Sequence, residues 1–290
     1  ADTNDRPLLP KQNTILHQDA VLAYDEKIPR RDAEGKVVEI WDGITTKPHP
    51  VTGKEVPDER AKKVLYDYTN PRRPEWPEAD YVVGNPPFLG SKRMRESFGD
   101  GYTTALYSVW KDDIPGACDF VFYWWFIAAE KVQDGNLKRF GFITTNSLSQ
   151  VTARKVTERF LKSTKNPVKL AFAIPDHPWV DSSDGASVRI SMTVGTLEKN
   201  EGILGQVQNE ENCSTGEHNV SIALRTGEIG SNLKIGPRFG ELSPLQSNRR
   251  LCWQGCKLVG SGFQIDFTTL TKFLEANPNS EKHLPCYWAG

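Results

Sequence analysis

A short apolar run that ends in two consecutive prolines is the feature that most constrains this sequence. Residues 80–83 (Asp-Tyr-Val-Val) favour a β-strand, and residues 85–88 (Asn-Pro-Pro-Phe) follow after one glycine. Proline lacks a backbone N–H and fixes its own φ angle, so two prolines in succession cannot continue a central strand. We therefore expect the strand to end here and the next residues to form a rigid loop at the edge of a sheet.

The residue types in this loop suit a planar heterocycle that carries an exocyclic amino group. Open α/β sheets bind their ligands beyond the carboxyl ends of the strands, which is where this loop would lie. Asn85 offers a side-chain carbonyl, and Pro86 offers a main-chain carbonyl with no competing N–H. The ring of Pro87 helps to keep both acceptors rigid, and Phe88 offers a flat face for stacking. The alternative is that these four residues form only a strand-terminating turn.

Strands and helices alternate over residues 14–197, which predicts an α/β fold with a mostly parallel sheet. The helix expected at residues 117–133 is apolar nearly all round and should therefore be buried. A second, amphipathic helix is expected at residues 152–163. Strands are expected at residues 14–19, 80–83, 140–145, 168–174 and 187–197.

Two changes in composition divide the chain. Residues 24–79 are polar and rich in Pro, Lys, Asp and Glu, and a loop of this length is usually an insertion or functional. After about residue 198, Gly and Asn become frequent and helix signals fade until residues 267–276. We expect a catalytic part at residues 1–197, with the insertion at 24–79, followed by a mixed or β-rich segment at residues 198–290.

Composition excludes several classes of protein. The 290 residues carry 36 Lys+Arg and 37 Asp+Glu, so the chain as a whole is not polybasic and any nucleic-acid contact must come from a local patch. The longest nearly apolar run, residues 120–129, is about half of the ~20 residues needed to cross a bilayer. Five cysteines, an odd number, fit a reducing cytoplasm. No metal site is expected, although the C-x3-C pair Cys252 and Cys256 leaves a zinc site open.

At this point the sequence resembles a known family. Residues 80–92 (Asp-Tyr-Val-Val-Gly-Asn-Pro-Pro-Phe-Leu-Gly-Ser-Lys) resemble the catalytic motif of amino-group DNA methyltransferases of the adenine-N6 type. The closest subgroup is the single-chain restriction-and-modification enzymes similar to MmeI, of types IIG and IIL. Further segments resemble motifs of the same family, namely residues 15–20, 118–120, 141–147, 176–179 and 186–192, the pre-catalytic insertion at 47–79 and the entry to the target-recognition region at 258–263.

The resemblance implies a Rossmann-like class I methyltransferase sheet and S-adenosyl-L-methionine as the methyl donor. It implies that Asn85, Pro86, Pro87 and Phe88 form the catalytic loop, which grips the N6 amino group of an adenine turned out of the duplex. It also implies that Asp19, Asn85 and Asp119 bind the cofactor. For Asp19 the alternative is a surface acid after a strand, and for Asp119 it is an acid in the first turn of a helix.

The implied partner is double-stranded DNA. Residues 198–290 would be a linker and the start of the target-recognition region, and any nuclease domain would lie outside this stretch on the same full-length chain. Trp179 would pack on the base opposite Phe88, or be plain core. Lys92 and Arg93 would contact phosphates, or form a solvated helix face. Asn146, in the strand motif at residues 141–147, would contact DNA or the base.

The sequence departs from the family pattern in one important respect. The Gly-rich loop that binds the methionine end of the cofactor should precede Asp19 and is absent, and residues 259–263 (Val-Gly-Ser-Gly-Phe) are a poor substitute. We therefore expect a fragment that lacks the first βαβ unit and is inactive alone. Two alternatives remain open: a methyltransferase that acts on an RNA base or a protein glutamine, and a non-catalytic DNA-binding module.

Overall fold

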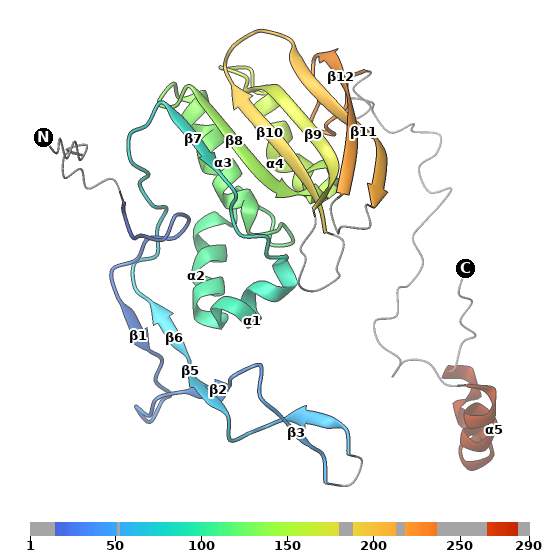
Figure 1. The fold of residues 1–290 in the computed structure, drawn as a ribbon. Coiled ribbons are helices and arrows are strands. Elements are labelled where there is room, and N and C mark those ends of the chain that lie inside the picture. The colour runs from blue at the N-terminus through green and yellow to red at the C-terminus, as the bar shows by residue number, and fades with distance from the viewer. Residues whose placement is uncertain (1–14, 51–52, 180–187, 213–217, 237–265, 284–290) are drawn as a thin grey trace, which may run out of the picture. The chain divides into compact units, whose positions relative to one another are not determined.

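The computed structural model describes residues 15–50, 53–179, 188–212, 218–236 and 266–283 (Figure 1). The chain divides into two compact units, Ala1–Pro237 and Arg238–Gly290. The described part of the second unit consists of helix α5 (Phe267–Ala276) and the 3-10 turn η6 (Pro278–His283). Asp266 begins α5 as its N-cap, because its side chain accepts a 2.8 Å hydrogen bond from the N–H of Thr269.

The first unit is built on a six-stranded mixed sheet, which confirms an α/β fold (Figure 1). Strands β7 (Tyr81–Gly84) and β8 (Arg139–Thr145) are parallel, as are β9 (Lys169–Trp179) and β11 (Gly202–Asn212). Strand β10 (Val188–Thr196) is antiparallel to both β8 and β9. The expectation of a mostly parallel sheet is therefore wrong. Only residues 180–187 connect β9 to β10, and a parallel connection needs a crossover of a dozen or more residues. In spatial order the strands are β12 (His218–Gly227), β11, β9, β10, β8 and β7.

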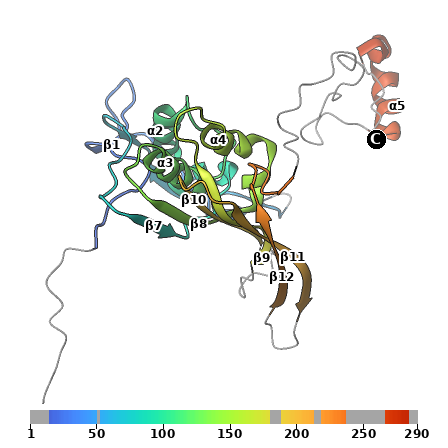
Figure 2. The same ribbon diagram turned by 90° about the horizontal axis from the view of Figure 1, so that it is seen from above.

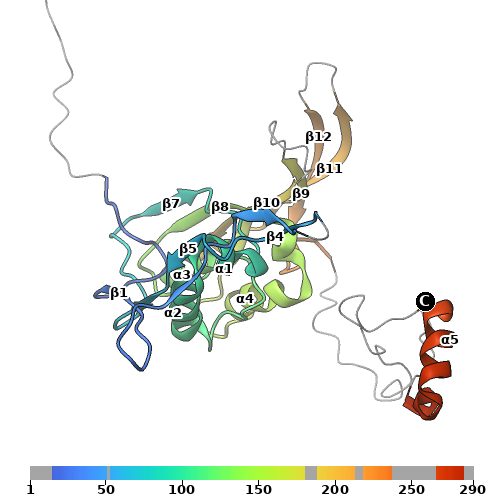
Figure 3. The same cartoon turned by 90° about the horizontal axis from the view of Figure 1, so that it is seen from below.

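Helices α2 (Asp100–Trp110), α3 (Val121–Gln133) and α4 (Val151–Leu161) lie on one side of this sheet (Figures 2 and 3). The helix α3 is buried nearly all round, as its sequence predicts, and Phe122, Trp125 and Phe126 are fully inaccessible. The Trp125 ring packs edge-on against Phe140 of β8 at 5.3 Å between centroids. Each such side chain contributes about 1.5–3 kcal/mol by burial, so α3 anchors the helical layer to the sheet.

The N-terminal segment differs from the prediction of a buried strand at residues 14–19. In its described part, from residue 15, it pairs with no strand, and Ile15 is 91% exposed and Leu16 58% exposed. A strand is stable only where a neighbour satisfies its backbone N–H and C=O groups. Within the described ranges, β7 is an edge strand of the sheet and pairs only with β8, so residues 15–19 do not add a further strand beside it.

The polar stretch at residues 24–79 folds into three nested antiparallel ribbons. They pair β1 (Lys27–Pro29) with β6 (Tyr66–Tyr68), β2 (Glu39–Trp41) with β5 (Lys62–Val64), and β3 (Thr46–Pro48) with β4 (Glu55–Pro57). The ribbons approach the body of the unit at Gly101 in α2. A Cβ atom there would lie 1.7 Å from the carbonyl oxygen of Tyr66, so only glycine allows this close approach.

Strands β11 and β12 lie beyond residue 198, where composition predicts a boundary, yet they extend the same sheet. Ile203 and Leu204 of β11 pair with Phe172 and Ala173 of β9, and the compact unit runs to Pro237. A target-recognition role for residues 198–290 remains a prediction. Residues 258–263 and the cysteines 252 and 256 lie outside the described residues. No helix in the described part of the chain is long and apolar enough to span a membrane.

Candidate active site

The Asn-Pro-Pro-Phe loop leaves the carboxyl end of β7, as the sequence predicts. Asn85 is exposed, Pro86 is buried, and Phe88 is half-buried. Within the described ranges the Asn85 amide makes no hydrogen bond, so both of its polar atoms remain available to a ligand. The loop is tied to the start of α3, because the N–H of Phe120 donates a 2.8 Å hydrogen bond to the carbonyl of Leu89.

The structure brings Phe88 and Trp179 together, although they lie far apart in the sequence. Their ring centroids are 6.4 Å apart, and the ring planes meet edge to face at 77°. Both side chains are half-buried, so neither belongs to the closed core. Aromatic pairs of this geometry are mutually stabilising, and here they stand together beside the loop that carries Asn85.

Asp119 lies at the carboxyl end of β8 and is held by two hydroxyl groups. Its Oδ2 accepts hydrogen bonds of 2.8 Å from Thr145 and 2.6 Å from Ser147. A Cβ atom at Gly90 would lie only 3.7 Å from Asp119 Oδ1, which places the acid just beyond the Asn-Pro-Pro-Phe loop. Asp119 does not cap α3 with its side chain. The structure therefore joins the loops that follow β7 and β8 through one carboxylate.

Asp19 is half-buried, and both oxygens of its carboxylate accept hydrogen bonds from the protein. Its Oδ1 accepts from the backbone N–H groups of Val21 and Leu22 at 2.9 and 3.0 Å, and its Oδ2 accepts from the Tyr102 hydroxyl at 2.7 Å. Burial, and then the hydrogen bond to Asp19, raise the pKa of the Tyr102 phenol well above its ordinary value. Tyr102 therefore remains a neutral donor at physiological pH.

A row of aromatic rings connects Asp19 to the neighbourhood of Asp119. Phe98 packs against Tyr102 at 5.1 Å and against Phe120 at 4.7 Å between centroids. Asp19 also borders a cavity of about 590 Å³, together with Gln18, Leu22, Ala23, Tyr24 and residues 72–75. Its lining is mixed, because charged and polar side chains stand beside Leu22, Ala23 and the Tyr24 ring.

Lys92 and Arg93 are exposed in the short turn η1 (Ser91–Arg93), shortly after the Asn-Pro-Pro-Phe loop. Neither makes an ion pair with any residue that the structure describes. Arg95 differs, because it pairs with Asp100 at 2.8 Å. Two cations that no described residue neutralises thus stand next to the loop.

Asn146 uses both polar atoms of its amide within the protein. Its Nδ2 donates to Asp176 Oδ1 at 2.9 Å, and its Oδ1 accepts from the backbone N–H of Asp176 and from the Ser191 hydroxyl. The predicted contact of Asn146 with DNA remains a prediction, and in this structure the residue connects β8 to β9 and β10.

Sequence reasoning missed Tyr102, Thr145 and Ser147 as members of these networks. A signal existed for two of them, since Thr145 and Ser147 are hydroxyl residues directly at the end of a predicted strand, where ligands bind in such sheets. No local pattern marks Tyr102, because its partner is 83 residues away.

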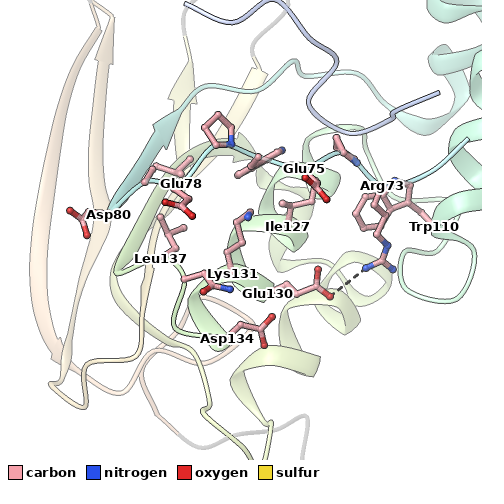
Figure 4. Close-up of a pocket in the computed structure, with 16 residues that line it drawn as sticks. Arg73, Glu75, Glu78, Asp80, Trp110, Ile127, Glu130, Lys131, Asp134 and Leu137 are labelled. Carbon is pink, nitrogen blue, oxygen red and sulfur yellow. Dashed lines mark hydrogen bonds and ion pairs between the residues drawn. The ribbon is translucent and has the colours of Figure 1, made fainter. Parts of the chain in front are cut away.

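A second cavity, of about 860 Å³, lies between residues 73–80 and α3 (Figure 4). Arg73 lies at one end of it and pairs with Glu130 at 3.3 Å (Figure 4). None of the predicted site residues lines this cavity. Within the described residues, no group of His, Cys, Asp or Glu side chains is arranged to hold a metal ion.

Comparison with known proteins identifies the class of this chain. Residues 6–204 match the family model of the MmeI DNA-methyltransferase domain. The fold is therefore that of a methyltransferase domain. The chain belongs to the MmeI DNA-methyltransferase domain family.

Comparison with solved structures finds the type IIL restriction-modification enzyme MmeI in complex with DNA, at 22% sequence identity and a TM-score of 0.45. The match covers 70% of this chain and 26% of that one, so the chain spans about a quarter of the length of that enzyme. No curated protein matches the sequence.

Proposed function

We propose that this domain transfers a methyl group to the N6 amino group of adenine in DNA, as the modification activity of a restriction-modification system. Membership of the MmeI methyltransferase family supports the reaction class. The observation that carries the proposal is the unpartnered Asn85 amide beside the Phe88–Trp179 pair at the end of β7. This corner offers hydrogen-bond acceptors and aromatic surface, which a base removed from its stack requires.

Asn85 and the Pro86 carbonyl would accept the two hydrogens of the amino group. Held in this way, the nitrogen lone pair is directed out of the ring plane. Phe88 and Trp179 would hold the ring itself, with a change of their present edge-to-face angle when a base enters. Catalysis then consists of positioning and charge stabilisation, without a covalent enzyme intermediate.

S-adenosyl-L-methionine, when bound, supplies the methyl group from its sulfonium centre. The residues around Asp19 would take its adenosine end, because the carboxylate borders a cavity of about 590 Å³ that also offers polar side chains and the Tyr24 ring. Asp119, fixed by Thr145 and Ser147, would hold the cofactor next to the catalytic loop. A Rossmann-like sheet is part of this proposal, and the parallel pair β7–β8 with α3 between its strands is a βαβ unit that supports it.

The test measures the transfer of radiolabelled methyl groups by the full-length protein to unmethylated DNA, RNA and protein. We expect labelled DNA whose only modified nucleoside is N6-methyladenine. Asn85→Ala should reduce turnover by about a hundredfold or more, as loss of a positioned hydrogen-bond acceptor in the transition state does, with DNA binding almost unchanged. Asn200→Ala is the matched control, because Asn200 is exposed and lies beyond β10.

The same measurement separates the alternatives. Label that appears only in RNA or on a protein glutamine would replace the proposed substrate with one of those two. DNA binding with no transfer to any substrate would favour a non-catalytic binding module. The isolated 290 residues should bind the cofactor weakly, because their sequence contains no Gly-rich loop before Asp19.

A further inference from the structure

Strand β9 contains a bulge just before Trp179. His177 pairs with Ile190 of β10, and the next pair is Ile174 with Met192. One residue of β10, Ser191, therefore lies opposite both Pro175 and Asp176. Asp176 adopts a φ angle of +54°, in the left-handed region that non-glycine residues seldom occupy. An extra residue on one strand, with one residue of the bulge in this region, is a β-bulge.

The bulge decides which face of the sheet Trp179 occupies. In a regular strand, side chains alternate between faces, so residues 174 and 179 would point in opposite directions. Here Ile174 lies opposite Met192 and Trp179 lies opposite Val188. Met192 and Val188 are four positions apart along β10 and share a face, so the extra residue puts Trp179 on the face of Ile174. Phe88 meets Trp179 there.

Two side chains hold the bulge, one from the 3-10 turn η2 (Asn146–Ser149) after β8 and one from the neighbouring strand β10. Asn146 binds Asp176 twice, donating to Oδ1 at 2.9 Å and accepting from the backbone N–H at 3.1 Å. Arg189 donates from Nε to Asp176 Oδ1 at 2.9 Å and from Nη2 to the Asp176 carbonyl. Both the side chain and the main chain of the bulged residue are therefore restrained.

Arg189 is itself fixed from the other side. Its two Nη atoms bind both carboxylate oxygens of Glu210 on β11, at 2.8 and 2.9 Å. The hydrogen bonds to Glu210 and then to Asp176 raise the pKa of the Arg189 guanidinium above its ordinary value. A bidentate guanidinium–carboxylate pair has a defined geometry, so Arg189 reaches Asp176 from a fixed direction.

We propose that Asn146, Asp176 and Arg189 are positioning residues that set the bulge of β9 and thereby hold Trp179 against Phe88. The consequence for catalysis rests on the proposed function, in which these two rings hold the target base. The three residues act through Trp179 and need no contact with DNA. This assigns to Asn146 a role different from the direct DNA contact that its motif implies.

The test is a double-mutant cycle in the full-length protein. Asp176→Gly keeps the left-handed backbone conformation accessible and removes the carboxylate. Arg189→Gln removes the guanidinium that binds Asp176 and Glu210. Each should lower kcat by roughly tenfold, since small displacements of positioning groups have effects of this order, and leave KM for DNA within about twofold. In a Trp179→Ala background, Asp176→Gly should lower kcat no further, because both changes then affect one interaction.

Two comparisons show whether the loss is specific. Asp176→Asn keeps an acceptor for Arg189 and tolerates the left-handed conformation, so it should restore most of kcat. Arg139→Gln removes a similar ion pair, 2.6 Å to Glu198, at the opposite end of the sheet, and should leave kcat unchanged. Unfolding midpoints of all variants identify any that fail to fold.

A measurement independent of activity uses 5-fluorotryptophan and 19F NMR, with the Trp179 resonance assigned by its loss in Trp179→Phe. We expect this resonance to shift in Asp176→Gly and Arg189→Gln and not in Arg139→Gln. If the wild type transfers no methyl group, the proposed function fails, and this spectrum alone decides the positioning role. A Trp179 resonance that does not shift in Asp176→Gly and Arg189→Gln overturns the inference. So does a double variant in which the kcat losses of Trp179→Ala and Asp176→Gly simply multiply.

Discussion

The hydroxyl of Tyr102 donates a 2.7 Å hydrogen bond to Asp19, across 83 positions of the sequence. Asp19 lies in an otherwise irregular segment, and Tyr102 lies in the first turns of α2. This bond, with those from the N–H groups of Val21 and Leu22, leaves Asp19 little freedom to turn. The proposed cofactor site therefore depends on a helix that belongs to a different part of the chain.

The first prediction concerns the affinity for the methyl donor. Tyr102→Phe removes the hydrogen bond to Asp19 and leaves the ring packing against Phe98 in place. We expect KM for S-adenosyl-L-methionine to rise about five- to tenfold, corresponding to about 1 kcal/mol for one hydrogen bond, while kcat stays within about twofold of wild type. Tyr107→Phe, which loses a 3.1 Å bond to the Gly116 carbonyl, is the matched control. Equal effects in the two variants would contradict the role of Tyr102.

The second prediction concerns stability at high pH. The pKa of Tyr102 is raised in the folded state from 10.0 in a model compound. Its contribution to stability is therefore complete below about pH 10 and falls as the pH rises above that value, because only the unfolded state then loses the proton. We expect the urea midpoint of the wild type to decrease more steeply from pH 9 to pH 11 than that of Tyr102→Phe. Parallel curves would show that Tyr102 ionises normally.

The third prediction concerns salt dependence. Lys92 and Arg93 are exposed and shortly follow the Asn-Pro-Pro-Phe loop. The logarithm of the DNA-binding constant falls linearly with the logarithm of the salt concentration, by about 0.9 for each phosphate that is neutralised. If each residue contacts one phosphate, replacing both with Gln should make this slope shallower by about 1.8. The control is the double variant Lys199→Gln, Lys234→Gln. Both lysines are exposed, and they follow β10 and β12, respectively, outside the Asn-Pro-Pro-Phe loop. An unchanged slope for the Lys92 and Arg93 double variant would show that these two residues do not contact DNA phosphates.

The fourth prediction tests the attachment of the nested ribbons. Gly101→Ala places a methyl group where the Tyr66 carbonyl lies, so α2 and β6 must separate. We expect the free energy of unfolding to fall by about 3 kcal/mol or more, because the backbone around the new methyl group has few ways to relax. This loss outweighs the higher helix propensity of alanine. Gly116→Ala is the control, since its methyl group would meet only the Tyr107 ring at 3.8 Å. Urea denaturation measures both, and equal stability of the two variants would argue against this close contact.

Several elements follow from local sequence alone. The two prolines end β7 at Gly84, and the apolar circumference of residues 121–133 produces a buried helix. The motif around Asn85 also indicates the methyltransferase family, which the family match confirms. Each of these depends on neighbours within a few positions, so periodicity and residue type are sufficient to predict it.

Other elements required the folded chain. The predicted strand at residues 14–19 has an apolar pattern but no strand beside it in the described structure, and the polar stretch at 24–79 forms ribbons through pairs such as Lys27 with Tyr68. Strand formation depends on a partner supplied from elsewhere in the chain. A pattern within one segment does not contain that partner.

The sequence by itself determined the amide–diproline–phenylalanine corner, the burial of α3 and the family. Only the tertiary structure decided that Trp179 meets Phe88, that Tyr102 holds Asp19 and that Asn146 binds the bulge of β9. The physical reason is that backbone restriction and hydrophobic periodicity act over a few residues. The contacts of Trp179 and Asp19 depend instead on strand order, on register and on one extra residue at position 176, which together decide where distant side chains meet.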